Sequence, residues 1–355
     1  MVKGLRLHAL LFREDAALST LSTIHPRLAL FGAEQRSPNL PVCDHYAGIE
    51  ARMRKSLALQ ADMAEKTDGR AVFDVTLDLE DGAPVGGEHE QALLVAELIN
   101  SPSNACGRVG ARVHAPSHPR FEDDIQTLIQ QAGHRLAYLM VPKVAGEEET
   151  KRAVEAIKAA RLKHGVGHIV PVHVLIETHH ALQEVAAIAA LPGVESLSFG
   201  LMDFVSEHRG AIPASAMSAH GQFHHPLVLR AKLEIAAACH AARITPSHCV
   251  VTEFKDSRAL GVAAERASRE LGYTRMWSIH PDQIPVIVDA FAPVAAEVDD
   301  AVAILSAAQQ AHWAPTSYRS VLHDRASYRH YWHVLERAWL TGQPLPAEIE
   351  AAFFG

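Results

Sequence analysis

The chain has 355 residues, of which 48% are hydrophobic, so it can form one large core or two ordinary ones. Lys and Arg number 33 against 41 Asp and Glu, which gives a formal net charge of -8 and argues against a nucleic-acid-binding protein. No apolar run reaches the roughly 18 residues of a membrane span. The four cysteines have no metal-ligand spacing and indicate buried thiols in a reducing compartment. We therefore expect a cytoplasmic protein.

Short apolar segments alternate with amphipathic stretches along most of the chain. The segments are too short and too evenly apolar for half-exposed strands, so each should be covered on both faces. We expect strands at 41–46, 73–78, 110–114, 136–141, 172–176, 194–199, 249–252 and 276–279, and helices at 48–66, 147–163, 181–190 and 227–242.

Eight strand–helix units predict an α/β fold, a parallel (β/α)8 TIM barrel over residues 37–292. An open doubly wound sheet is the alternative, but no G-x-G-x-x-G motif opens a helix after the first strand. Residues 1–36 are expected to be an N-terminal extension. Residues 293–355 are expected to form a C-terminal helical extension, with helices at 298–311 and 328–340.

Charged residues follow several of the expected strands, at the end of the barrel where catalytic side chains of this fold lie. Glu80 and Asp81 follow the second strand, Arg112 lies in the third, and Glu177 and Asp203 follow the fifth and sixth. The carboxylates of Glu177 and Asp203 should converge above the barrel and leave room for water and substrate, as a Mg2+ site requires. Arg112 could bind a substrate carboxylate or a developing oxyanion.

A family resemblance rests on six motifs and their order. They are Asp78-Leu79-Glu80-Asp81, Arg112-Val113-His114, Val141-Pro142-Lys143-Val144, Ile176-Glu177-Thr178, Phe199-Gly200-Leu201-Met202-Asp203 and Ile279-His280-Pro281-Asp282-Gln283. Over about residues 40–292 the chain resembles the citrate lyase beta subunit and malyl-CoA lyase group of the HpcH/HpaI aldolase superfamily. The resemblance implies a Mg2+-dependent carbon–carbon lyase on a TIM barrel, assembled as a homotrimer or hexamer.

The resemblance also implies a metal site. Glu177 and Asp203 would ligate Mg2+, with Mn2+ as an alternative ion. Glu80 and Asp81 would lie behind the ion, act through bound water and belong to the catalytic residues.

Substrate contacts follow from the same resemblance. Arg112 would be the catalytic residue that contacts the substrate oxygens and helps hold the enolate. The backbone at Gly200 and Leu201 would bind a substrate carboxylate, and Glu177 would also contact the substrate. The substrate would be a small carboxylate or an acyl-CoA thioester.

Two features depart from the family pattern. The first strand contains Cys43-Asp44-His45-Tyr46-Ala47-Gly48 in place of the usual Val-Pro-Gly, which leaves the use of CoA thioesters open. The C-terminal aspartate that malyl-CoA lyases use as a general acid or base has no clear counterpart, although Asp299, Asp300 and Asp324 are alternatives. His280, after the last strand, either lines the site or has a structural role.

Three functions remain open at this point. The first is a Mg2+-dependent lyase that cleaves or forms a 3-hydroxyacyl (thio)ester, or a related hydroxy acid, through a metal-stabilised enolate. The second is a class II pyruvate aldolase acting on free 4-hydroxy-2-oxo acids, although such aldolases typically have histidine where Asp81 stands. The third is a non-catalytic barrel that binds metal and oxo acids.

Overall fold

The structure, a computed structural model, describes residues 24–32 and 39–355. These residues form two compact units, one of residues 39–291 and 340–342, the other of residues 24–32, 292–339 and 343–355. Most of the expected N-terminal extension, residues 1–23 and 33–36, lies outside the described residues. No helix in the described part of the chain is both long and apolar enough to span a membrane.

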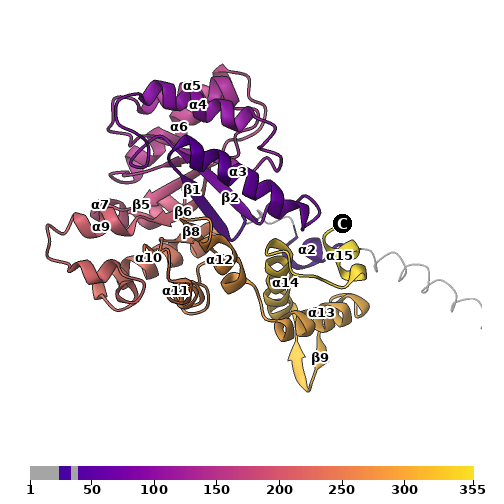
Figure 1. Ribbon diagram of the computed structural model, residues 1–355. Helices are drawn as coiled ribbons and strands as arrows, with labels where there is room; N and C mark the ends of the chain where they lie inside the picture. Colours follow the sequence, from indigo (N-terminus) through magenta and orange to yellow (C-terminus); the bar gives the residue numbers. More distant parts are fainter. Residues whose placement is uncertain (1–23, 33–38) are drawn as a thin grey trace, which may run out of the picture. The chain divides into compact units, whose positions relative to one another are not determined.

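Residues 39–291 contain a closed barrel of eight parallel strands, which confirms the predicted (β/α)8 fold (Figure 1). Neighbouring strands pair in chain order, and the last strand closes the barrel by pairing with the first. The strands are β1 (Cys43–Ala47), β2 (Phe73–Asp78), β3 (Val109–Arg112), β4 (Leu139–Val141), β5 (Val172–Ile176), β6 (Val194–Phe199), β7 (Thr245–His248) and β8 (Arg275–Ser278).

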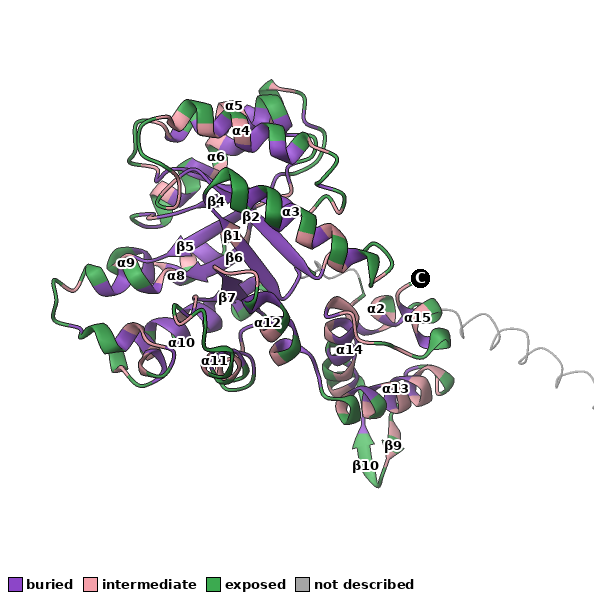
Figure 2. Ribbon diagram, viewed as in Figure 1, coloured by how far each residue is buried: buried purple, intermediate pink, exposed green. Residues whose placement is uncertain are grey.

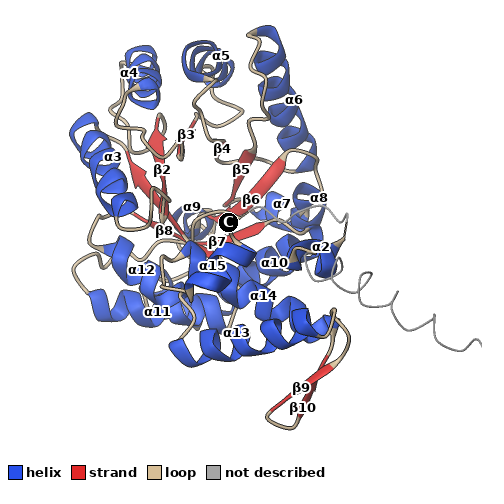
Figure 3. Ribbon diagram, turned by 90° about the vertical axis from the view of Figure 1, so that its right-hand side faces the viewer, coloured by secondary structure: helices blue, strands red, loops and turns tan. Residues whose placement is uncertain are grey.

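Helices form a layer outside the strands (Figure 3). The predicted helix at 181–190 is interrupted at Glu184, which ends one short helix and begins the next. The helices of this unit are α3 (Glu50–Glu65), α4 (Glu88–Asn100), α5 (Phe121–Ala132), α6 (Glu147–Lys163), α7 (His179–Gln183), α8 (Val185–Ala189), α9 (Leu201–Ser206), α10 (Pro226–Ala242), α11 (Ser257–Arg269) and α12 (Gln283–Phe291), with 3-10 turns η2 (Ala214–Met217) and η3 (Gly221–Phe223).

The strands are buried nearly throughout, as Figure 2 shows, which confirms that helices cover them. The main apolar core lies around the strands and the inner faces of the helices. Deep among the strands, Arg275 pairs with Asp74 at 2.6 Å and with Asp44 at 3.1 Å. Thr76 donates a hydrogen bond to Asp44 at 2.7 Å. This ionic cluster is enclosed, since the Arg275 side chain is only 1% exposed.

The seventh strand was predicted wrongly at 249–252, because β7 is the preceding segment Thr245-Pro246-Ser247-His248. Its polar residues and its proline hide the strand from an apolar pattern. His248 is nevertheless buried and lies 2.8 Å from the buried Nζ of Lys232 on α10. The apolar residues Cys249 and Val251 belong to the loop that follows β7.

The smaller unit is mainly helical, as predicted for the C-terminal extension. It also contains one β-hairpin that was not predicted. Its apolar core includes the buried residues Tyr328, Trp332 and Leu335. Arg319 and Ser320 have positive φ angles and form the turn between its two strands. Its elements are α2 (Pro26–Phe31), α13 (Ala295–Gln310), β9 (Thr316–Tyr318), β10 (Val321–His323), α14 (Arg325–Leu340) and α15 (Ala347–Phe353).

Candidate active site

A buried ion pair joins the carboxyl ends of β2 and β3. The strand register pairs Asp78 with Arg112, and Arg112 donates from Nε to Asp78 Oδ1 at 2.7 Å and from Nη2 to Oδ2 at 2.9 Å. Burial opposes ionisation of Asp78, but the Arg112 guanidinium outweighs it and holds the pKa of Asp78 below its usual value. The bidentate contact fixes the plane of the guanidinium.

Tyr46 on β1 completes this arrangement. Its hydroxyl donates to Asp78 Oδ2 and accepts a hydrogen bond from Arg112 Nη2 at 3.0 Å. The tyrosine ring also lies 4.9 Å from the guanidinium and stacks on Trp277. Burial raises the pKa of Tyr46, so the hydroxyl stays protonated. The sequence had singled out the unusual first strand without assigning this role to Tyr46.

Lys143, directly after β4, connects the acidic residues. Its Nζ donates to Glu80 Oε1 at 2.5 Å and to Asp81 Oδ2 at 2.7 Å, and lies 3.9 Å from Asp203 Oδ1. Its backbone N–H donates to Glu177 Oε1 at 2.7 Å. Lys143 has a φ of 51°, an uncommon conformation for a residue with a side chain. One strained residue therefore contacts four carboxylates, a role that the sequence did not suggest.

Glu177 and Asp203 differ in their surroundings. Glu177 is 2% exposed, and burial together with the nearby Asp203 carboxylate raises its pKa to about 8. The side chain of Asp203, in the first turn of α9, is 40% exposed. A Cβ at Gly200 would lie 2.1 Å from Glu177 Oε2, so a glycine is needed where β6 ends. Leu201 is buried at the start of α9.

The predicted site residues thus share one network at the carboxyl ends of the strands. Arg112 contacts Glu80 through Nη1 at 3.3 Å, and Lys143 links Glu80 to Asp81, Asp203 and Glu177. Across residues 24–32 and 39–355, no group of three or more His, Cys, Asp or Glu side chains is arranged to hold a metal ion. A metal on two carboxylates would take its remaining ligands from water or substrate.

Two of the three acids proposed from the C-terminal segment have partners in their own unit. Asp300 accepts a hydrogen bond from Tyr318 Oη at 3.1 Å and pairs with Arg319 at 3.1 Å. Asp324 accepts from the backbone N–H of Ala326 at 2.9 Å at the start of α14. Asp299 is exposed on α13. Two of the three acids therefore make local structural contacts.

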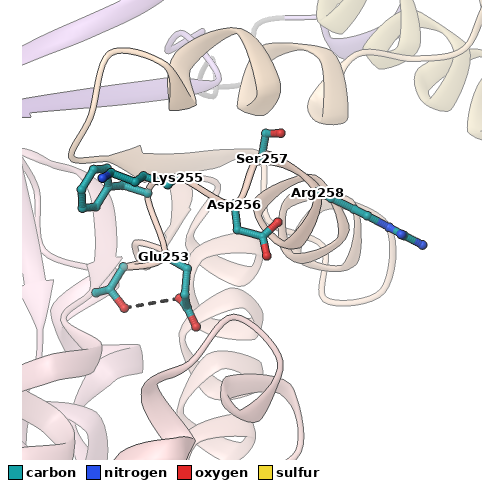
Figure 4. A pocket seen from close by; sticks show the side chains of 7 residues that line it. Glu253, Lys255, Asp256, Ser257 and Arg258 are labelled. Carbon is teal, nitrogen blue, oxygen red and sulfur yellow. Dashed lines mark hydrogen bonds between the residues drawn. The ribbon is translucent and has the colours of Figure 1, made fainter.

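His280 lies beside the loop after β7, with its ring stacked on Phe254 at 5.2 Å. An open hollow of about 510 Å³ lies on this loop and is lined by residues 252–258, whose side chains Figure 4 shows. The hollow lacks Arg112, Glu177 and Asp203. The ion network, and not this hollow, therefore defines the candidate site.

The barrel sequence matches a known protein family. A model of the HpcH/HpaI aldolase/citrate lyase family matches residues 56–281, and the chain belongs to that family, as its motifs predicted. Among solved structures it resembles a citrate lyase from Burkholderia xenovorans LB400, at 51% identity and a TM-score of 0.79, over 93% of this chain and 100% of that one.

More distant relatives have similar names or the same fold. The L-malyl-CoA/beta-methylmalyl-CoA lyase of Cereibacter sphaeroides is 29% identical over 75% of this chain and 87% of its own. Protein CitE of Mycobacterium tuberculosis, solved with magnesium, acetoacetate and coenzyme A, shares the fold at 20% identity and a TM-score of 0.60, over 84% of this chain and 98% of that one. The relatives are named lyases, which confirms the prediction of a carbon–carbon lyase.

Proposed function

We propose that the protein is a Mg2+-dependent lyase that cleaves or forms the carbon–carbon bond of a 3-hydroxyacyl-CoA thioester or a related hydroxy acid. The observation that carries the proposal is that the carboxylates of buried Glu177 and half-buried Asp203 lie near each other and near the fixed guanidinium of Arg112. A similarity to malyl-CoA lyase supports the thioester as substrate.

The acids fit a hard divalent cation. Glu177 and Asp203 offer oxygen ligands, and burial, together with the nearby Asp203 carboxylate, raises the pKa of Glu177, an effect that a bound cation would oppose. The Mg2+ site proposed here would use these two residues, with Glu80 and Asp81 behind it through water, and Mn2+ suits the same donors. When bound, the ion would polarise a substrate carbonyl and stabilise the enolate that bond cleavage leaves.

Arg112 would also stabilise the enolate. Asp78 and Tyr46 occupy its Nε and Nη2, so Nη1, which faces Glu80, keeps donor capacity for a substrate oxygen. The backbone around Gly200 and Leu201, where α9 begins, would bind the substrate carboxylate, through the N–H of Leu201 because the N–H of Gly200 donates to Ile176 O at 3.0 Å. An acidic chain can therefore bind an anionic substrate, because the cation and Arg112 supply positive charge locally.

The organisation of the chain forms part of the same proposal. All the residues assigned to the reaction lie within 37–292, which we assign as the catalytic domain, with 1–36 and 293–355 as appendages. Assembly as a homotrimer or hexamer is the arrangement that the family resemblance implies.

A turnover assay tests the function. Purified protein with Mg2+ is offered malyl-CoA, citramalyl-CoA and free 4-hydroxy-2-oxo acids, and Glu177→Ala and Asp203→Ala are compared with wild type. We expect cleavage of a thioester that both variants lose. Glu155→Ala, an exposed acid on α6, is the matched control and should retain full activity.

Other outcomes would overturn the proposal. Cleavage of the free hydroxy-oxo acids alone would establish the pyruvate aldolase reaction instead. Absence of turnover, together with calorimetric binding of Mg2+ and oxaloacetate, would establish a non-catalytic barrel. Full activity in both acid variants would show that the site is assigned to the wrong residues.

A further inference from the structure

The proposed reaction needs a group that accepts and returns a proton, and the site network offers none that is free. Glu80 and Asp81 are paired with Lys143, and Glu177 with Asp203 would serve the metal ion. In the smaller unit, Asp300 and Asp324 make contacts with their own surroundings, and Asp299 is an exposed acid on α13 that no residue in the described part of the chain positions. Other titratable side chains lie at the carboxyl ends of the strands.

His114 lies at this end of the barrel, two residues after Arg112. The ladder between β3 and β4 continues past Arg112, because the N–H of Val113 donates to Met140 O at 3.1 Å. In an extended chain, residues two apart point to the same side and have Cα atoms roughly 6.6 Å apart. A substrate of a few heavy atoms bound at Arg112 is therefore within reach of the His114 ring.

Asp124, in the first turn of α5, fixes the ring of His114. The same carboxylate oxygen, Oδ2, accepts from the backbone N–H of His114 at 3.0 Å and lies 2.6 Å from Nδ1. Asp124 is 1% exposed and His114 is 8% exposed. A proton on Nδ1, facing the carboxylate, leaves Nε2 with a lone pair. Among the described residues, none forms a hydrogen bond with Nε2 of His114.

The residues around His114 leave its imidazole ring able to accept a proton. The ring of His118, on the following loop, stacks on it with centroids 4.2 Å apart and leaves the ring edge open. Arg120 on the same loop and Glu88 at the start of α4 are the other charged groups whose fields couple to the dyad. A buried carboxylate that orients a histidine whose second nitrogen is free is the arrangement of a general base.

We propose that His114, positioned by Asp124, is the acid–base residue of the lyase reaction, an inference that rests on the function proposed above. In the cleavage direction, Nε2 takes the proton of the substrate 3-hydroxyl as that oxygen forms a carbonyl. The bond between C2 and C3 breaks, and its electron pair passes into the enolate. The imidazolium then returns the proton to C2, so the histidine ends in its initial state.

The experiment compares His114→Gln and Asp124→Asn with wild type, using malyl-CoA cleavage and the exchange of acetyl-CoA methyl protons with D2O. General acid–base groups contribute about 100-fold or more to rate, so we expect His114→Gln to lower kcat by about that factor, to abolish the exchange and to leave KM nearly unchanged. Imidazole added to His114→Ala should restore part of the rate.

Asp124→Asn has a distinct signature. The imidazolium loses its carboxylate partner, so the limb of the pH–rate profile that reports the base should move to lower pH. Matched controls are His134→Gln, an exposed histidine just beyond α5, and Asp123→Asn, the exposed neighbour of Asp124. Both controls should retain wild-type rates and profiles, and circular dichroism should show that all variants are folded.

The two proposals fail differently. If wild type cleaves the thioester and His114→Gln keeps its rate and its exchange, the acid–base assignment is wrong and the lyase function stands. If wild type cleaves no thioester, both proposals are wrong. A rate loss in His114→Gln without imidazole rescue in His114→Ala, and with an unshifted profile in Asp124→Asn, would reduce the dyad to a structural contact and overturn the assignment.

Discussion

Two buried arginines in the barrel, Arg112 and Arg275, make similar contacts and have different consequences. Each pairs with two carboxylates, Arg112 with Asp78 and Glu80, and Arg275 with Asp74 and Asp44. The surroundings of Arg275 are closed, since its Nη1 also donates to Pro41 O at 2.9 Å and its side chain is 1% exposed. The cluster around Arg275 therefore serves folding.

The surroundings of Arg112 are open at one side. Glu80, one of its partners, also binds Lys143, whose side chain is 31% exposed and reaches Asp81. Charge added by a substrate or a metal ion can therefore redistribute these contacts without unfolding the barrel. A buried arginine paired with two acids is therefore structural where its ion pairs are closed off, as at Arg275, and functional where they continue to exposed side chains, as through Lys143 to Asp81.

The largest expected effect is at Arg275. In Arg275→Met, Asp44 stays buried without its cation, and removal of one partner of a buried pair costs about 3–5 kcal/mol of unfolding free energy. Urea denaturation followed by circular dichroism measures this loss. Arg230→Met, on the exposed face of α10, should change stability by less than about 0.5 kcal/mol. Equal stability of the two variants would mean that the closed cluster contributes little to folding.

The second effect concerns catalysis. Arg112→Lys keeps the charge and loses the planar fork that Asp78 holds, so the enolate loses an oriented donor. We expect kcat to fall about 100-fold or more, the usual cost of one oxyanion donor, while the fold is retained. Steady-state kinetics with malyl-CoA gives the value, and Arg230→Lys is the control. Turnover close to wild type would place the enolate away from Arg112.

The smallest effect sharpens the role of Tyr46. Tyr46→Phe keeps the ring that stacks on Trp277, at 6.0 Å between centroids, and removes only the hydroxyl. A net hydrogen bond contributes about 0.5–1.5 kcal/mol, which corresponds to a roughly 3- to 10-fold decrease in kcat if the hydroxyl orients Arg112. Tyr331→Phe, in the smaller unit, should have no effect. An unchanged kcat in Tyr46→Phe would mean that Asp78 alone orients Arg112.

The barrel could be predicted from the sequence because strands that are covered by helices consist of short runs of apolar residues. β7 was not predicted, because Ser247 and His248 are fully buried polar residues that a search for apolar runs does not find. The hairpin of β9 and β10 was also missed, because strands of three residues carry too little pattern.

The part of the site that the sequence predicted consists of residues at the ends of strands. Glu177 and Asp203 could be found because parallel strands deliver their last residues to one end of the barrel. Contacts between long side chains could not be predicted from the sequence. Lys143, for example, contacts Glu80, which lies 63 positions earlier, and does so from a backbone with positive φ. Asp124 lies on a helix outside the strands, where an acid more often faces solvent.

Gly200 shows how little freedom the site allows. It supplies no charge and no side chain, yet any larger residue would place its Cβ against Glu177 Oε2 and force that carboxylate to move. Among random variants selected for activity, position 200 should therefore accept glycine alone, as strictly as the charged positions do. A search for functional residues that considers only reactive or charged side chains would overlook Gly200. The absence of a side chain at Gly200 nevertheless leaves the space that the Glu177 carboxylate occupies.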